Sequence, residues 1–140
     1  MKELVNLIKF PLHEDGNNEL VVAEGSSSNV PFNISRVFNV QAVKGSIRGN
    51  HAHFRCTQIL ICTIGSIEVI CDDGLSSETY ILDKSNYGLI IKPGVWAKQK
   101  YLEKNTVLTV LCDRPYEEED YICNYDDFKK MKNNFNRELG

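Results

Sequence analysis

The feature that most constrains the fold of this chain is a series of short runs rich in β-branched and aromatic residues, with turn-forming residues between them. Runs of this kind at regular spacing are typical of antiparallel sandwiches and barrels. We expect strands in the runs 19–23, 34–41, 58–63, 66–71, 78–82, 88–92 and 106–112. Asp73-Gly74 predicts a hairpin turn. Only 124–135 has apolar residues at helical spacing. The sequence therefore predicts an all-β fold, one domain over 1–140, with a short C-terminal helix.

Composition excludes several classes of function. The chain has 140 residues and a net charge of −3, so no basic surplus supports general binding to nucleic acid. No segment approaches the ~18 consecutive apolar residues of a membrane span, and the start is too weakly apolar for a signal peptide. The five cysteines include no CxxC pair, which favours reduced, mostly buried thiols. We expect a cytosolic protein.

The most informative polar cluster lies at 48–58. His51 and His53 are two residues apart, so on a strand both side chains project from one face. The same alternation predicts Arg55 on that face and Cys56 on the opposite one. A row of titratable groups facing the interior of a small barrel is costly unless a ligand uses it. The cluster, which also contains Arg48 and Gln58, is therefore a candidate site.

A metal site is the first alternative to weigh for the two histidines. The spacing from Gly45 through His51, His53 and Gln58 to Gly65 follows the first cupin motif, but Gln58 stands where metal-binding cupins usually carry Glu. The stretch 88–98, which corresponds to the second motif, contains no third histidine. Two imidazoles and one neutral amide are a weak ligand set for a divalent ion. We expect no metal, and histidines that are merely hydrogen-bonded remain a further alternative.

The segment Arg48-Gly49-Asn50-His51-Ala52-His53, with Gln58 and the turn at 65–66, resembles the nucleotide-sugar 3,4-ketoisomerases, which are WxcM-like cupins. The stretches 30–38, 72–74, 88–96 and 115–128 agree with the same family. The resemblance implies a cupin jelly roll, a homodimer in which the N-terminal strand is the interface element, and no metal or organic cofactor. It also implies a dTDP-linked substrate, dTDP-4-keto-6-deoxyglucose, whose keto group moves from C4 to C3.

This resemblance assigns roles to residues of the cluster. Histidine with a pKa near neutrality suits transfer of the protons on adjacent carbons, so we expect His51 to be the base and His53 its partner. Arg48 is the expected donor to the enediolate oxygen. The candidate substrate contacts are Arg36, Asn39, Arg55, Gln58 and Trp96, although core packing is the commoner role for a lone tryptophan. The acidic run 117–120 is interpreted as a solvated turn without chemistry.

Several positions depart from the family pattern. Polar groups that other members carry are replaced here at Asn17, Asn39, Ala97 and Cys123. The stereochemistry at C4 of the product is therefore left open. Two rivals also stay open: a metal-dependent cupin enzyme that uses His51 and His53, and a nucleotide-sugar-binding module without catalysis.

Overall fold

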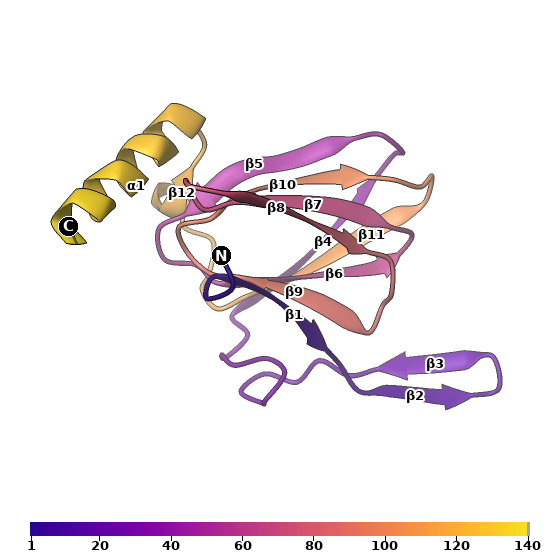
Figure 1. Ribbon diagram of the computed structural model, residues 1–140. Coiled ribbons are helices and arrows are strands. Elements are labelled where there is room, and N and C mark those ends of the chain that lie inside the picture. The colour runs from indigo at the N-terminus through magenta and orange to yellow at the C-terminus, as the bar shows by residue number, and fades with distance from the viewer. Residues whose placement is uncertain (140) are drawn as a thin grey trace.

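The computed structural model describes residues 1–139, and two five-stranded antiparallel sheets face each other in it (Figure 1). The first sheet has the order β1 (Val5–Lys9), β9 (Tyr87–Ile91), β6 (Gln58–Ile64), β11 (Thr106–Cys112), β4 (Arg36–Ala42). The second has the order β12 (Tyr121–Ile122), β5 (Ile47–His53), β10 (Trp96–Tyr101), β7 (Ile67–Asp72), β8 (Ser77–Leu82). The prediction of a cupin-type all-β fold with one C-terminal helix is confirmed.

The core forms where the inward faces of the two sheets meet. Along β7, buried and half-buried residues alternate from Ile67 to Asp72, as expected for a strand with one face in the core. The central cluster combines side chains of both sheets, among them Leu60, Val69, Leu89 and Leu108. Burial of this apolar surface is the main stabilising contribution to the sandwich, at roughly 25 cal/mol per Å².

Elements outside the two sheets cover their remaining surfaces. A second apolar cluster on the outer face of the first sheet includes Ile59, Ile61 and Ile90, with Val21 and Phe32 packed against it. The hairpin of β2 (Leu12–Asp15) and β3 (Asn18–Val21) projects away from the sandwich and pairs only with itself among the described strands (Figure 1). The expected homodimer stays a prediction.

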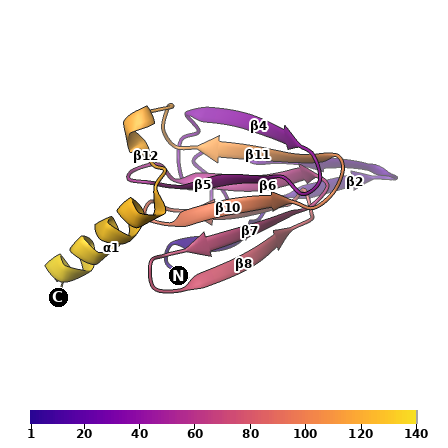
Figure 2. The same cartoon turned by 90° about the horizontal axis from the view of Figure 1, so that it is seen from above.

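The helix α1 (Tyr125–Leu139) lies at the end of the sandwich opposite this hairpin, beside β12 (Figure 1, Figure 2). Its Phe128 is fully buried against Ala52 and Ile122, with Trp96 packed on the same cluster. Among residues 1–139, no helix is long and apolar enough to cross a membrane. The short 3₁₀ helix η1 (Glu118–Asp120) precedes β12 and brings the C-terminal segment back to the edge of β5.

Some strands were not among the expected runs. They are β1, β2, β5, β10 and the two-residue β12. In β10, the sequence Trp-Ala-Lys-Gln-Lys-Tyr has few β-branched residues, yet it forms the centre of a sheet between β5 and β7. Pairing on both sides has outweighed its weak local preference, which is the usual context dependence of strand propensity. The predicted hairpin at Asp73-Gly74 is present between β7 and β8.

Candidate active site

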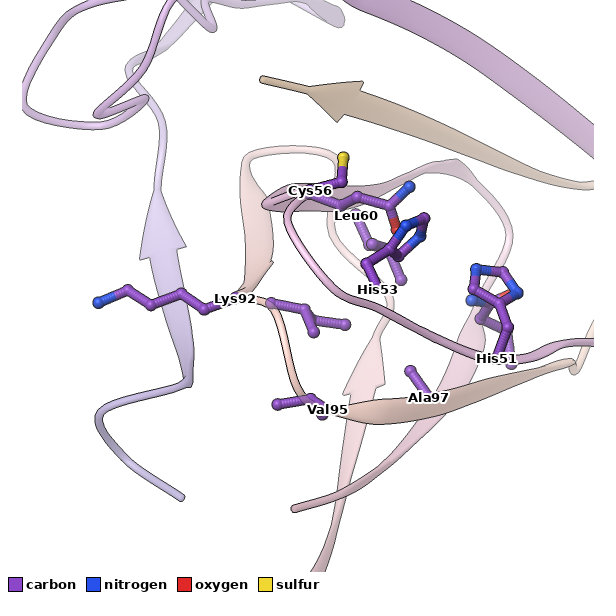
Figure 3. Close-up of a pocket in the computed structure, with 10 residues that line it drawn as sticks. His51, His53, Cys56, Leu60, Lys92, Val95 and Ala97 are labelled. Atoms are coloured by element: carbon purple, nitrogen blue, oxygen red, sulfur yellow. The ribbon is translucent and has the colours of Figure 1, made fainter. Parts of the chain in front are cut away.

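Between the two sheets, at the end near β12, lies a small cavity with both polar and apolar lining (Figure 3). Its polar lining comes from His51 and His53 on β5, Gln58 on β6 and Gln99 on β10. The enclosed space is about 10 Å³, room for roughly one water molecule. The side chain of Lys92 extends away from the two imidazoles. The cavity thus gathers imidazoles and amides inside an otherwise apolar sandwich.

A β-bulge in β5 orients its histidines. Gly49 and Asn50 both have positive φ, of 85° and 56°, and the pairing with β10 shifts at this point. Gly49 is required here for two reasons: its positive φ strains other residues, and a Cβ at this position would lie only 3.0 Å from Nε2 of Gln99. Arg48 is thereby placed opposite Gln99, and His51 opposite Ala97. Directly opposed residues of an antiparallel pair share a face, so the bulge brings Arg48 and His51 to one side.

His53 is held by a carboxylate from a distant part of the chain. Its Nδ1 lies 2.9 Å from Oδ2 of Asp120, which is 67 residues away in sequence. The backbone N–H groups of Arg55 and Cys56 donate to the two oxygens of Asp120, at 2.7 and 3.2 Å. His53 and Asp120 are only 7% and 5% exposed. The other ring nitrogen of His53, Nε2, is buried without a hydrogen-bond partner among the described residues.

An aromatic ring and a guanidinium lie beside the two histidines. The ring centroid of Tyr121 lies 5.0 Å from that of His51 and 4.4 Å from that of His53, and the two imidazoles are 5.0 Å apart. Nη2 of Arg36 donates to the hydroxyl of Tyr121 at 3.4 Å and to Sγ of Cys112 at 3.5 Å. The positive charge of Arg36 is therefore fixed beside the histidines by half-buried and buried partners.

Two buried cysteines, Cys56 in the lining of the cavity and Cys112 in contact with Gln58 and Arg36, have pKa values shifted in opposite directions. Hydrogen bonds from the Cys56 thiol, Arg36 and Gln58 lower the pKa of Cys112 to about 6, in spite of its burial. The hydrogen bond with Cys112, together with burial, raises the pKa of Cys56. Cys112 is wholly buried, with 0% exposure.

The environment keeps both histidines neutral to a lower pH than usual. Burial lowers the pKa of His51, and the neighbouring His53 lowers it further, against a hydrogen bond with the backbone of Gly49. Burial also lowers the pKa of His53, and the charge of Arg36 adds to this, whereas Asp120 opposes it. A neutral imidazole is the form that accepts a proton, so both rings are ready to act as bases near neutral pH.

The structure brings together some of the predicted site residues. His51, His53 and Gln58 line one cavity, and Arg36 lies close to it. Arg48 is exposed, at the position opposite Gln99. Cys56, predicted on the opposite face from the histidines, lines the same cavity, because β5 ends at His53 and strand alternation does not continue through the bend that follows.

Three predicted substrate contacts lie elsewhere. Asn39 is exposed on the outer face of β4, where its Oδ1 accepts a hydrogen bond from Thr109 at 2.6 Å. The side chain of Arg55 is exposed, and its contribution to the site is the backbone N–H that binds Asp120. Trp96 packs against Tyr125 and Phe128, with ring centroids 5.3 and 5.8 Å away, beneath α1. The geometry does not place these three side chains in the cavity.

Asp120 is the principal residue that sequence reasoning missed. The acidic run 117–120 was interpreted as a solvated turn, and this interpretation is wrong for Asp120, which is buried and bonded to His53. Glu118 and Glu119 are exposed, as expected. The available signal was the apolar pair Tyr121-Ile122 directly after the run, which indicates that the chain enters the interior there.

The described residues also include one group that could hold a metal ion. Ligand atoms of His53, Cys56 and Asp120 lie within 4.8 Å of one another, and all three residues are buried. Imidazole, thiolate and carboxylate are ligands that Zn²⁺ accepts. In the structure, however, the carboxylate of Asp120 already binds two backbone N–H groups and His53. These contacts favour a hydrogen-bonded dyad over a metal centre.

Comparisons with known proteins agree with the site. The chain matches the family described as FdtA: WxcM-like, C-terminal, over residues 3–133. It is 39% identical over 125 residues to a TDP-4-oxo-6-deoxy-alpha-D-glucose-3,4-oxoisomerase of Aneurinibacillus thermoaerophilus, with 89% of each protein covered.

Solved structures resemble the whole sandwich. QdtA, a sugar 3,4-ketoisomerase from Thermoanaerobacterium thermosaccharolyticum in complex with TDP, has a TM-score of 0.90 and 34% identity, covering 96% of this chain and 98% of QdtA. A variant of QdtA with asparagine in place of a histidine, in complex with TDP-4-keto-6-deoxyglucose, has a TM-score of 0.89 and 34% identity, covering 94% and 96%. The predicted resemblance is thereby confirmed: the chain belongs to the FdtA family of WxcM-like proteins and is an isomerase.

Proposed function

We propose that the protein is a 3,4-ketoisomerase of a TDP-linked sugar, with TDP-4-keto-6-deoxyglucose as the substrate. The observation that supports this most directly is the pair of imidazoles whose centroids are 5.0 Å apart at one cavity, one of them bonded to a buried carboxylate. The relatives at 39% and 34% identity are named for this reaction or hold this sugar nucleotide.

The reaction moves two hydrogens, and two bases suit it. A carbon-bound proton leaves C3 and a proton is added to C4, while the hydroxyl proton on O3 leaves and O4 gains one. The electron pair of the C3–H bond passes into an enediolate and then into the new C4–H bond, so no oxidant or reductant is needed. Histidine near its neutral pKa is suited to both kinds of transfer.

We assign the carbon-bound proton to His51. This ring is half-buried, whereas His53 lies deeper, so His51 is the imidazole that a bound sugar reaches first. His51 takes the proton from C3 and, after exchange with solvent, delivers a proton to C4. His53 accepts the hydroxyl proton from O3 and delivers it to O4. Each histidine ends the cycle as it began.

The cations near the cavity have two tasks in this proposal. The space of about 10 Å³ cannot hold a sugar ring, so the substrate lies at the mouth of the barrel with its C3–C4 edge toward the histidines. Arg48, on the His51 side of the bulge, stabilises the enediolate oxygen. Arg36 contributes positive charge from the opposite sheet, and guanidinium groups bind diphosphate as a bidentate fork.

In this proposal catalysis needs no metal. Metal independence can be tested separately from the reaction itself. The rival is an ion at His53, Cys56 and Asp120. Purified protein would be analysed for bound transition metals and assayed before and after dialysis against a chelator. Unchanged turnover with substoichiometric metal is expected. Stoichiometric metal whose removal abolishes turnover would favour the metal-dependent rival.

The reaction itself is tested by incubating the protein with TDP-4-keto-6-deoxyglucose in D₂O and following the sugar by NMR. The carbonyl carbon is expected to move from C4 to C3, with deuterium entering at C4 because the proton on His51 exchanges with solvent. The coupling between H4 and H5 in a matched H₂O reaction reads the configuration at C4. TDP binding without isomerisation would instead identify a non-catalytic binding module.

A further inference from the structure

The contacts of Asp120 determine which nitrogen of His53 carries the proton. Oδ2 of Asp120 accepts the backbone N–H of Cys56 at 3.2 Å, and Oδ1 accepts that of Arg55 at 2.7 Å. Two oxygens that both accept backbone N–H groups are in an arrangement that suits a carboxylate, which accepts hydrogen bonds and has no proton to donate. The 2.9 Å contact between Oδ2 and Nδ1 of His53 is therefore a hydrogen bond donated by the ring.

A neutral imidazole has one N–H, and here it is on Nδ1. The opposite nitrogen, Nε2, then carries a lone pair and cannot donate. Nε2 of His53 is buried and has no hydrogen-bond partner among the described residues, and His53 lines the cavity with Gln58 and Gln99. An unpartnered acceptor is costly in an apolar interior, but it is suited to receive a proton from a ligand hydroxyl.

We propose that Asp120 is a positioning residue, which holds His53 in the Nδ1–H tautomer and so keeps the Nε2 lone pair available to the substrate. The inference rests on the proposed function in naming the ligand, which is the hydroxyl on C3 of the sugar. The O3–H bond breaks as Nε2 gains the proton. The resulting imidazolium is stabilised by the charge of Asp120 until the proton passes to O4.

The charged groups around His53 show why Asp120 would do more than pack against the ring. The negative charges that face it are Asp120 from η1 and Asp113 beyond β11, and the positive charge is Arg36 from β4. The other titratable groups next to the ring are His51, Tyr121 and Cys56. Asp120 is hydrogen-bonded to the ring at 2.9 Å, so its replacement by an amide changes the tautomer as well as the charge.

The tautomer can be read directly in the protein without substrate. Long-range ¹H–¹⁵N NMR of ¹⁵N-histidine-labelled protein at pH 8 distinguishes a protonated from a lone-pair nitrogen, with His53→Asn used to assign the signal. The wild-type protein is expected to show Nδ1–H for His53. Asp120→Asn presents an N–H to the ring, so His53 should change to Nε2–H. A wild-type protein with Nε2–H, or a variant that keeps the wild-type tautomer, would overturn the proposal.

Kinetics test the consequence for catalysis. Asp120→Asn is expected to lower kcat at least about 100-fold, the lower end for a side chain that transfers a proton, with KM changed less than about 3-fold. In the His53→Asn background the same change should cost less than about 3-fold, because Asp120 then has no ring to position. The matched control is Glu119→Gln, which removes one charge from an exposed neighbour in η1 and should behave as wild type.

The outcomes keep the two proposals apart. Absence of isomerase activity in the wild-type protein contradicts the proposed function and leaves the NMR result to decide on Asp120. Wild-type kcat in Asp120→Asn, or an equal loss in the presence and absence of His53, contradicts the positioning role. If Asp120→Asn fails to fold because a backbone N–H loses its acceptor, the tautomer of His53 in the wild-type protein still decides the assignment.

Discussion

The cavity has an outer part around His51 and an inner part around His53, and the protein supports the two rings differently. His51 is half-buried, opposite Ala97, with the rings of His53 and Tyr121 as neighbours and a backbone hydrogen bond with Gly49. His53 is buried and bonded to Asp120, which two backbone N–H groups hold in place.

The difference shows how one residue type is used for two tasks. A ring with freedom at the mouth can approach a carbon-bound proton, while a ring locked by a carboxylate presents a fixed lone pair. The two histidines come from the same strand, so the distinction arises from what the rest of the chain brings to them. The outer part receives the bulge of β5, and the inner part receives η1 from 67 residues away.

The largest expected effect comes from exchanging the outer ring. His51→Asn should lower kcat by about 10²- to 10⁴-fold, the range for loss of a proton-transferring group, with TDP affinity retained. Measurement combines the NMR assay with calorimetric titration of TDP. If His53→Asn were the more damaging of the two substitutions, the assignment of the carbon-bound proton to the outer part would be wrong and should be reversed.

Arg36 tests how far the inner part depends on its cation. Its guanidinium binds the hydroxyl of Tyr121 and the sulfur of Cys112 at 3.4 and 3.5 Å. Hydrogen bonds to charged groups contribute ~1.5–3 kcal/mol, and these two are long, so their loss should cost an amount near the low end of that range. Arg36→Gln is therefore expected to lower kcat/KM about 10-fold. Arg36→Lys, which keeps the charge, should lose less. Equal losses in both variants would show that the fork geometry matters more than the charge.

Variation of pH compares the two rings without mutation. Burial lowers the pKa of both histidines below the usual 6.5, so both remain neutral and able to accept a proton down to that pH. The acid limb of kcat/KM is therefore expected below pH 6.5, and activity at pH 6.5 should exceed about a quarter of its plateau, because each of the two rings is then more than half neutral. An acid limb centred above pH 6.5 would contradict the expectation that His51 and His53 both have pKa values below 6.5.

The same shifts predict how stability changes with acidity. The unfolded chain binds protons at its histidines near pH 6.5, before the folded protein does. The free energy of unfolding should therefore fall as the pH drops through 6.5 toward the lower folded pKa values. Urea unfolding at pH 7.5 and 6.0 measures this, and His51→Asn should make the dependence shallower.

Much of the fold and the outer part of the site follows from local patterns in the sequence. Runs of alternating β-branched residues predicted most strands, and the spacing around His51 and His53 predicted that both rings share a face. These features extend over a few residues, within the range of strand periodicity. The bulge at Gly49-Asn50 could not be read in this way, although it sets the side on which Arg48 lies.

The inner part depends on contacts that no local pattern reports. Asp120 reaches His53 only because β12 pairs with β5, and a two-residue strand carries almost no periodic signal. Alternation also failed beyond His53, where the strand ends and the chain bends, so Cys56 rather than Arg55 faces the cavity. Trp96 lies outside the cavity, because α1 covers it, and a single residue type does not reveal which face of β10 a helix covers.

The smallest effects are expected at two predicted contacts that the structure places outside both parts of the cavity. Arg55→Ala keeps the backbone N–H that holds Asp120, and Asn39→Ala removes an amide from the outer face of β4. Each should change kcat/KM less than about 2-fold, because neither side chain touches the cavity. Surface substitutions of this kind usually alter the free energy of unfolding by no more than about 0.5 kcal/mol, so the fold should also be retained. If Arg55→Ala instead weakened substrate binding by about tenfold, the exposed guanidinium of Arg55 would have to change conformation and bind the diphosphate of the substrate at the opening of the cavity. The substrate site would then include, besides the parts around His51 and His53, the bend that follows β5.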